Sequence, residues 1–239
     1  MTALAPFKFS IIVPIYNEDA TILTVLQKLN TLKKYYQNIQ IIVINDGSKD
    51  NSLEILENNK SLYDTLINNS TNKGKGNAVK KGLEVADGDY ITFQDADLEY
   101  DPNDYQKLIN PILAGKTKVV YGSRVLNKKR YSENSFTSLF RVFANHFLTI
   151  FSNILNNQNL TDAHTCYKVF HKEVLKDIKL KEKGFAFCPE ITTKISNLNI
   201  DIHEVPISYS GRSYLDGKKI KFSDGIEAIK SIIKYKLNV

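Results

Sequence analysis

The sequence predicts an α/β fold in which a mostly parallel central sheet is flanked by helices. Short runs of β-branched and other apolar residues alternate with segments of helical periodicity through the first half of the chain, and this alternation is typical of βαβ units. The run at residues 39–44 is almost entirely apolar, as expected for a strand covered on both faces. A chain of 239 residues can bury a substantial core as one domain.

The expected elements follow in a regular order along the chain. In the first half, strands are predicted over residues 9–15, 39–44, 62–67, 90–94 and 118–121, with helices over residues 20–35, from about 50, 76–86 and 102–113. In the second half, we expect a phenylalanine-rich helix, a strand at residues 167–170, a helix at 189–198, a strand at 200–207 and a last helix at 223–235.

Composition narrows the class of partner. The formal charge of +6 indicates either an anionic partner, such as a nucleotide or a lipid headgroup, or simply a solvated basic surface. Nucleic acid is not expected, because no basic–aromatic binding motif is present. Cys166 and Cys188 match no zinc or redox spacing, which favours free thiols in the cytoplasm. Residues 1–8 lack signal-peptide features, and no apolar run approaches the roughly 20 residues that a membrane span requires.

Polar clusters follow three of the predicted strands. They lie at residues 14–18, 45–48 and 95–99, directly after the first, second and fourth strands. Each cluster alone is compatible with an ordinary turn or helix cap. Because ligands of open α/β sheets bind at the carboxyl ends of the strands, three such clusters at one edge indicate a binding site.

The third cluster carries the residues typical of a metal site. Asp95 and Asp97 are separated by Ala96, and alternate residues of an extended segment point the same way. Both carboxylates can therefore reach one hard cation, Mg²⁺ or Mn²⁺, which takes oxygen ligands and often completes its shell with substrate phosphates. Glu99 lies one alternation further along and is a third candidate ligand. Without nearby His or Cys, zinc is not expected.

The ordered set of motifs resembles glycosyltransferase family 2. The motifs are Val-Pro-Ile-Tyr-Asn-Glu at 13–18, Asn-Asp-Gly-Ser-Lys-Asp at 45–50, Gly-Lys-Gly-Asn-Ala at 74–78 and Asp-Ala-Asp-Leu at 95–98. The resemblance runs over residues 9–235 and is strongest to the dolichyl-phosphate mannose synthases and related polyprenyl-phosphate glycosyltransferases. It implies a Rossmann-like nucleotide-diphospho-sugar transferase (GT-A) fold in one domain. Residues 9–124 would form its nucleotide-sugar-binding half and 125–239 its acceptor-side half.

The resemblance also implies roles for single residues on the donor side. Pro14, Tyr16 and Glu18 match the first nucleotide-binding loop of the family, while Ile44 and Asp46 match the pair that holds the base.

The phosphate-binding side of the donor site is implied in the same way. Asp95, Ala96, Asp97 and Glu99 match the metal and diphosphate site, although relatives often carry Gln or another polar residue at the last position. Arg124 matches an arginine near the donor phosphates. Arg212 and Lys218 match two basic residues of a loop that closes over the diphosphate. The loop at 211–219 differs from that of the mannose synthases, so the donor sugar is left open.

These assignments agree with the chemistry of sugar transfer. Cleavage of a sugar–diphosphate bond builds negative charge on the departing phosphate, which a metal at Asp97 together with Arg212 and Lys218 would stabilise. An arginine such as Arg124 also offers a two-pronged contact to phosphate oxygens. The alternative for all three basic residues is surface solvation.

The acceptor side is represented by Asp162, which matches an acidic residue that faces the acceptor in related enzymes. A hydroxyl acceptor would need Asp162 as a general base. A lipid monophosphate is already ionised, since its second pKa is about 6, and Asp162 would then orient the acceptor or a loop. A purely loop-ordering role is the third alternative.

The phenylalanine-rich helix has two interpretations. Its apolar residues recur at helical spacing: Phe136, Leu139, Phe140, Phe143, Phe147, Ile150, Phe151 and Ile154. They form either a core stripe or, with the preceding basic residues 128–130, a face for an anionic membrane. We therefore expect peripheral membrane contact or a membrane-anchoring partner protein.

Together these observations predict an inverting transferase that moves a hexose from a nucleotide diphosphate sugar, of the GDP-mannose or UDP-glucose type, to a polyprenyl or dolichyl phosphate. Its expected catalytic residues are Asp97, Asp162, Arg212 and Lys218. The first alternative is a hydroxyl acceptor on a glycolipid or glycan. The second is a non-catalytic nucleotide-sugar binder, which the intact acidic and basic motifs oppose.

Overall fold

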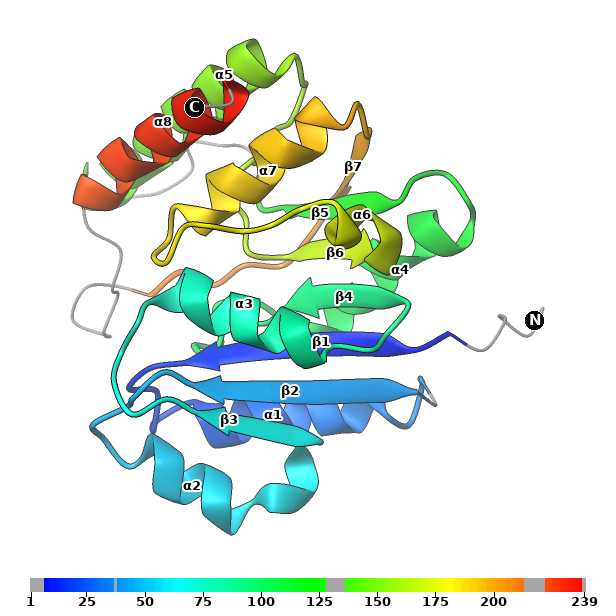
Figure 1. The fold of residues 1–239 in the computed structure, drawn as a ribbon, viewed down its shortest axis with the longest axis vertical. Helices are drawn as coiled ribbons and strands as arrows, with labels where there is room; N and C mark the ends of the chain where they lie inside the picture. Colours follow the sequence, from blue (N-terminus) through cyan, green and yellow to red (C-terminus); the bar gives the residue numbers. More distant parts are fainter. Residues whose placement is uncertain (1–6, 37, 128–135, 213–221, 238–239) are drawn as a thin grey trace.

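The computed structural model describes residues 7–36, 38–127, 136–212 and 222–237. Within these ranges, seven strands form one sheet in the order β3-β2-β1-β4-β6-β5-β7 (Figure 1). The strands are β1 (Phe9–Ile15), β2 (Ile39–Asn45), β3 (Thr65–Asn68), β4 (Tyr90–Phe93), β5 (Val119–Ser123), β6 (Lys168–His171) and β7 (Ile202–Pro206). All neighbouring pairs are parallel except those that β6 makes with β4 and β5. The predicted mostly parallel α/β sheet is confirmed.

Helices cover the sheet on both faces and at one end. They are α1 (Ile22–Leu32), α2 (Ser52–Asn58), α3 (Lys75–Val85), α4 (Tyr105–Leu113), α5 (Phe136–Asn156), α6 (Lys172–Lys176), α7 (Phe187–Asn197) and α8 (Phe222–Lys236). Helix α3 packs on β1 and β2, α4 packs on β5, β6 and β7, and α5, α7 and α8 pack on one another beyond β5 and β7 (Figure 1). No helix in the described part of the chain combines the length and apolar character needed to cross a bilayer.

Three differences from the predicted elements have local causes. The start of the third predicted strand is wrong, because Lys60–Leu62 forms a 3-10 turn and pairing begins only at Thr65. The predicted helix at 102–113 begins as a 3-10 turn. The Asp101 side chain caps this turn by accepting a hydrogen bond from the Asn103 N–H. Helix α6 was not expected, since five residues are too few to show a helical period.

Strand β6 joins the two halves of the chain in one sheet. It comes from the second half and lies between β4 and β5, which come from the first. Because β6 runs against its neighbours, the residues that precede it reach the same edge of the sheet as the loops that follow β1, β2 and β4. The acceptor-side motif around Asp162 is thereby delivered to the edge that carries the donor-side motifs.

The described part of α5 turns apolar side chains outward. Phe143, Phe147, Ile150 and Ile154 are between 46% and 74% exposed. Its fully buried side chains are instead polar: Thr149, Ser152 and Asn156. The Asn156 amide donates to Thr193 of α7, and Thr149 accepts from the Ala163 N–H. The core interpretation is therefore wrong for these four outward-facing residues, whereas Leu148, Phe151 and Leu155 are partly buried.

A lysine without a carboxylate partner lies in the core. The Lys168 side chain is completely buried on β6, and its Nζ donates to the Ala163 carbonyl (2.9 Å) and the Thr192 hydroxyl (3.4 Å). Its Nζ also lies 3.4 Å from the centre of the Tyr121 ring. Burial lowers the pKa of Lys168 to about 8. The lysine thus links the loop before β6 to α7, although burying its ammonium group away from water opposes its ionisation.

This lysine predicts a pH dependence of stability. Between pH 8 and 10.5, its ordinary pKa, the unfolded chain keeps the proton that the folded protein releases, so the contribution of Lys168 to stability should rise with pH. The full change is about 3 kcal/mol. Lys168→Met should lack this rise, measured as the free energy of unfolding of both proteins from pH 7.5 to 10. Equal pH slopes in the two proteins would contradict the assignment.

Candidate active site

The loops after β1 and β2 form one hydrogen-bonded unit at the carboxyl edge of the sheet. The Asn17 N–H donates to the Ser48 hydroxyl (3.0 Å), and the Lys49 N–H donates back to the Asn17 side-chain oxygen (2.8 Å). The Glu18 N–H donates to the Ser52 hydroxyl (2.9 Å). Asn17 adopts a left-handed φ of 51°, which asparagine tolerates better than most residues. Two of the three predicted clusters are therefore cross-linked.

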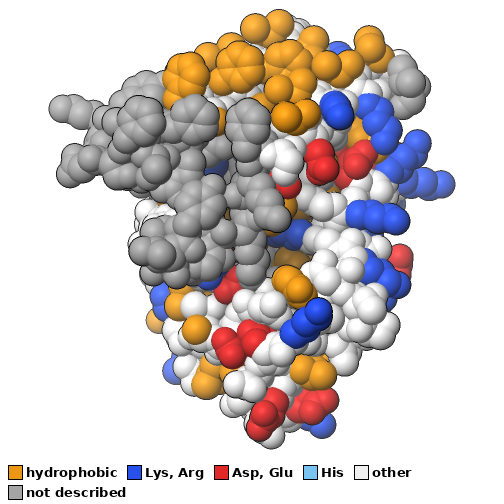
Figure 2. All heavy atoms as spheres, turned by 90° about the vertical axis from the view of Figure 1, so that its left-hand side faces the viewer, with side chains coloured by type: hydrophobic (Ala, Val, Ile, Leu, Met, Phe, Trp, Pro, Cys, Tyr) orange, Lys and Arg blue, Asp and Glu red, His pale blue; other side chains and the backbone are white. Residues whose placement is uncertain are grey.

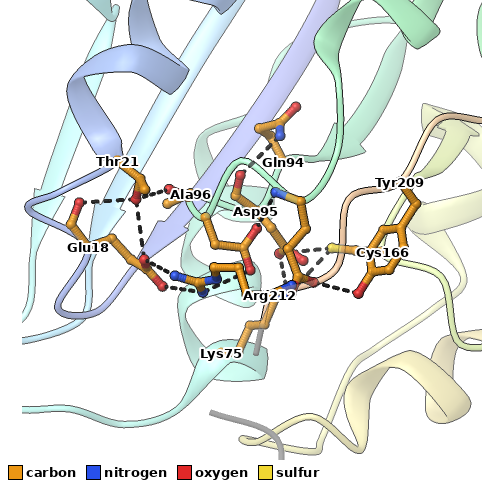
Figure 3. A network of polar contacts seen from close by, with 11 residues as sticks. Glu18, Thr21, Lys75, Gln94, Asp95, Ala96, Cys166, Tyr209 and Arg212 are labelled. Carbon is orange, nitrogen blue, oxygen red and sulfur yellow. Dashed lines mark hydrogen bonds and ion pairs between the residues drawn. The ribbon is translucent and has the colours of Figure 1, made fainter. Parts of the chain in front are cut away.

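The third cluster joins this unit through Thr21. Its hydroxyl donates to the Ala96 carbonyl (2.7 Å) and contacts the Glu18 carboxylate (3.3 Å) (Figure 3). As predicted from the sheet topology, the clusters after β1, β2 and β4 lie together.

Two cations neutralise the carboxylates of this site. Lys75, at the start of α3, pairs with Asp95. The Arg212 guanidinium contacts both Glu18 oxygens (3.0 and 3.2 Å) and Asp97 (3.1 Å) (Figure 3). The structure thus brings Arg212 to the carboxylates of this site, while its contact with a diphosphate stays a prediction and Lys218 lies outside the described residues.

The electrostatics of the acidic cluster suit a divalent cation. Burial, followed by the charges of Asp95 and Glu99, raises the pKa of Asp97 to about 6, so a further positive charge beside Lys75 and Arg212 would stabilise its ionised form. The Asp95 and Asp97 oxygens are ligands that Mg²⁺ and Mn²⁺ prefer. The expectation that no cysteine lies nearby is wrong, because the Cys166 thiol donates to the Asp95 carboxylate (3.0 Å). Burial raises the pKa of this thiol, which disfavours the thiolate that a metal would bind. Across the described ranges, no three His, Cys, Asp or Glu side chains are grouped closely enough to hold a metal alone. Asp95 and Asp97 therefore fit an ion that takes its remaining ligands from substrate phosphates and water.

Glu99 makes contacts that were not predicted. One of its carboxylate oxygens accepts from the Tyr209 hydroxyl and the other from the Arg212 N–H, each at 2.7 Å. Its role as a metal ligand stays a prediction, while its observed role is to hold the segment that leads to Arg212.

The residues predicted for the base lie mainly beneath the surface. Ile44 pairs across the sheet with Pro14 of the predicted nucleotide-binding loop and is fully buried, so its contact with a base stays a prediction. The Asp46 carboxylate accepts from the Asn69 amide and from the N–H groups of Lys73 and Gly74.

Asp46 therefore orders the loop at residues 69–74, and its contact with a base stays a prediction. A hollow of about 550 Å³ lies beside this loop, lined by Asn72, Lys73, Asn77 and Lys183. Tyr16 is partly buried in the loop after β1.

Sequence reasoning did not single out Lys75, although its neighbours carry a signal. Gly74 has a φ of +92°, and a Cβ there would lie 2.6 Å from the Lys183 carbonyl. A Cβ on Gly76 would lie 2.6 Å from the Glu182 carbonyl. The two glycines let residues 182–184 approach the start of α3, and this approach fixes the position of Lys75 between them.

Arg124, predicted near the donor phosphates, and Asp162, predicted to face the acceptor, form a buried ion pair. The Arg124 Nε and Nη2 donate to the two Asp162 oxygens at 2.7 and 2.8 Å, and the Arg124 backbone N–H donates as well (3.1 Å). Burial opposes ionisation of Asp162, but the Arg124 charge and hydrogen bonds outweigh it and lower the pKa of Asp162. A carboxylate held in this way is a poor general base. The phosphate contact predicted for Arg124 stays a prediction.

Comparison with known proteins identifies the family. The model of glycosyl transferase family 2 matches residues 10–179. The chain belongs to glycosyl transferase family 2. Among the relatives of this glycosyltransferase is a dolichyl-phosphate β-glucosyltransferase of Trichomonas vaginalis, 28% identical over 94% of this chain and 72% of the relative. Another is a UDP-N-acetylglucosamine–dolichyl-phosphate N-acetylglucosaminyltransferase of Methanococcus voltae, 30% identical over 82% of this chain and 83% of the relative.

Solved structures confirm the predicted GT-A fold. Glucosyl-3-phosphoglycerate synthase of Mycobacterium tuberculosis, in complex with Mn²⁺, UDP and phosphoglyceric acid, matches with a TM-score of 0.69 and 17% identity. The match covers 97% of this chain and 78% of that chain. The same synthase in complex with Mg²⁺ and UDP also gives a TM-score of 0.69, at 16% identity.

The buried ion pair predicts a large loss of stability in one variant. Asp162→Asn leaves the Arg124 guanidinium without its countercharge, which should lower the free energy of unfolding by about 3–5 kcal/mol in urea titrations. Glu173→Gln is the matched control, because the Lys118–Glu173 pair is more than half exposed at both side chains and an exposed ion pair contributes little to stability. Equally small losses in the two variants would contradict this assignment.

Proposed function

We propose that this glycosyltransferase moves a hexose from a nucleoside diphosphate sugar, of the UDP-glucose or GDP-mannose type, to a polyprenyl phosphate with inversion at the anomeric carbon. The observation that carries the proposal is the meeting of Glu18, Asp95 and Asp97 with the cations Lys75 and Arg212 at the carboxyl edge of the sheet. The names of the relatives, which specify dolichyl phosphate, support the acceptor.

Asp95 and Asp97 are the residues that would hold Mg²⁺ or Mn²⁺. When bound, the ion would neutralise the diphosphate and so make it a better leaving group. Support comes from the two carboxylate ligands and from the solved structures of similar fold that contain either ion together with UDP.

The basic residues are placed to act on the leaving group. As the anomeric carbon–oxygen bond breaks, its electron pair leaves with the nucleoside diphosphate, and an acceptor oxygen forms the new bond from the opposite face. Arg212 would stabilise the charge that develops on the leaving phosphate. Lys218 remains a predicted second cation of the same loop.

The state of Asp162 favours a phosphate acceptor over a hydroxyl. A hydroxyl must lose a proton, and Asp162, paired with Arg124 and lowered in pKa, is poorly suited to take it. A phosphate monoester arrives ionised and needs only positioning and charge neutralisation. We therefore assign Asp162 the role of holding Arg124 in place on the acceptor side.

A lipid acceptor requires access to a bilayer, and the surface formed by α5 and α8 fits this need. Figure 2 shows hydrophobic side chains gathered along this edge, with basic side chains nearby. Exposed apolar residues come from α5 (Phe143, Phe147, Ile150 and Ile154) and from α8 and the residue after it (Ile226, Ile233 and Leu237). Exposed lysines of α8, Lys230 and Lys234, add positive charge suited to anionic headgroups. We propose that this docking edge rests on an anionic bilayer.

The acceptor assignment predicts a clear preference in a transfer assay. With a panel of UDP- and GDP-hexoses, Mg²⁺ or Mn²⁺, and liposomes, polyprenyl phosphate should be glycosylated and the matching free alcohol should not. Products are identified by mass, and their anomeric configuration by NMR. Excess chelator should abolish the reaction. If only the alcohol is glycosylated, the acceptor is a hydroxyl and not a phosphate. Full activity in excess chelator would contradict the proposed metal requirement.

The docking edge predicts a separate effect on membrane binding. Changing Phe143 and Phe147 together to Gln should weaken binding to anionic liposomes at least about 10-fold in flotation assays, because each phenylalanine contributes on the order of 1 kcal/mol or more on burial. Transfer to a short-chain, water-soluble prenyl phosphate should be unchanged. Tyr35→Gln, at an apolar residue 76% exposed after α1, should change neither. Unaltered flotation of the double variant would contradict the proposed edge.

A further inference from the structure

The segment at residues 208–212, which ends at Arg212, is hydrogen-bonded along the loop after β4. The Ser208 N–H donates to the Asp104 carboxylate (2.6 Å), and the Ser210 N–H donates to the Glu99 carbonyl (2.9 Å). Tyr209 forms an antiparallel bridge with Tyr100. The Arg212 N–H then donates to the Glu99 carboxylate. The chain leaving β7 is thus hydrogen-bonded to residues 99–104 up to the residue whose side chain enters the site.

Tyr209, in the middle of this segment, contacts several neighbouring residues. Its hydroxyl donates to Glu99 (2.7 Å), and its ring packs edge-on against Tyr100 at 5.2 Å between centroids. The Arg124 guanidinium lies 5.1 Å from the ring centre. A Cβ on Gly211 would lie 3.0 Å from a ring carbon, so the backbone of the loop runs directly against the ring.

Within the described ranges, each Glu99 carboxylate oxygen accepts a hydrogen bond from this segment, one from the Tyr209 hydroxyl and the other from the Arg212 N–H. A carboxylate suits this place because both of its oxygens are acceptors. A glutamine would offer one oxygen and one NH₂ group, so it could accept from both partners only through one oxygen, or the Tyr209 hydroxyl would have to turn and accept. The N–H that Glu99 holds belongs to Arg212 itself, whose guanidinium reaches Glu18 and Asp97.

We infer that Glu99 and Tyr209 are positioning residues that set the place of the Arg212 guanidinium, and that Glu99 is not a ligand of the cation. The inference rests on the proposed function for its effect on transfer. The same contacts link the donor and acceptor sides of the proposed site. Glu99 fixes the Tyr209 ring, and the Arg124 guanidinium packs on that ring. Arg124 is in turn paired with Asp162, which is assigned to the acceptor side.

The first experiment separates a positioning residue from a metal ligand. Mn²⁺ binding in the presence of UDP or GDP is measured by calorimetry for the wild type, Glu99→Gln and Asp97→Asn. Positioning predicts that Glu99→Gln keeps the Mn²⁺ Kd within about twofold, whereas Asp97→Asn weakens it at least about 10-fold. A Kd weakened equally in both variants would overturn the inference.

The second experiment tests whether Tyr209 acts through Arg212. Tyr209→Phe keeps the ring and removes only the hydroxyl, so the fold should be retained. We expect kcat to fall about 10-fold with a donor KM changed less than threefold, since the lost alignment matters most in the transition state. In an Arg212→Ala background the same change should have no further effect. A full additional loss in that background would overturn the inference.

Hydrogen exchange tests the anchor without any substrate. The amide of Arg212 should exchange about 10-fold faster in both Tyr209→Phe and Glu99→Gln, because a fixed hydrogen-bond acceptor is lost or loosened. The amide of Ile207, bonded to the Ser123 carbonyl upstream, serves as internal control. Unchanged exchange at Arg212 would overturn the anchor. A wild type that binds neither nucleotide would instead contradict the proposed function, while exchange would still decide on the anchor.

Discussion

The site depends on the neutralisation of carboxylates that the fold crowds together at one edge of the sheet. Glu18, Asp95 and Asp97 come from the loops after β1 and β4, and their charges in a partly buried place repel one another more than they would in water. Lys75 and Arg212 compensate this repulsion. A diphosphate would bring further negative charge to these carboxylates, and this is the physical reason for the metal in the proposed function.

The antiparallel direction of β6 brings loops from both halves of the chain to the same edge of the sheet. Parallel strands alone would place their following loops at this edge and their preceding loops at the opposite one. With β6 reversed, the Asp162 loop arrives beside the donor loops, and the adjacent end of β5 supplies Arg124. The segment after β7, where Tyr209 lies, fills the space between these sides.

Local patterns in the sequence predicted those features that depend on neighbouring residues. The bounds of β1 follow from an apolar run that polar residues end, and the alternation of Asp95 and Asp97 located the acidic site. Features set by long-range contact were not predictable in this way. Lys75 meets a carboxylate 20 positions away and Tyr209 meets one 110 positions away, and no local period records such a pairing. The reversed direction of β6 has no signature in a four-residue strand either.

Helix α5 follows the opposite rule to a surface helix of a water-soluble enzyme, which buries apolar residues and exposes polar ones. In its described part, the buried Asn156 bonds to Thr193 of α7 and the buried Thr149 to the Ala163 N–H, while two phenylalanines and two isoleucines face water. Without lipid or a partner protein, an exposed apolar surface of this kind favours association with another copy of the chain. Particle sizes measured in plain buffer will therefore depend on protein concentration and detergent, and a dimer seen there will report the hydrophobicity of α5 rather than a functional assembly.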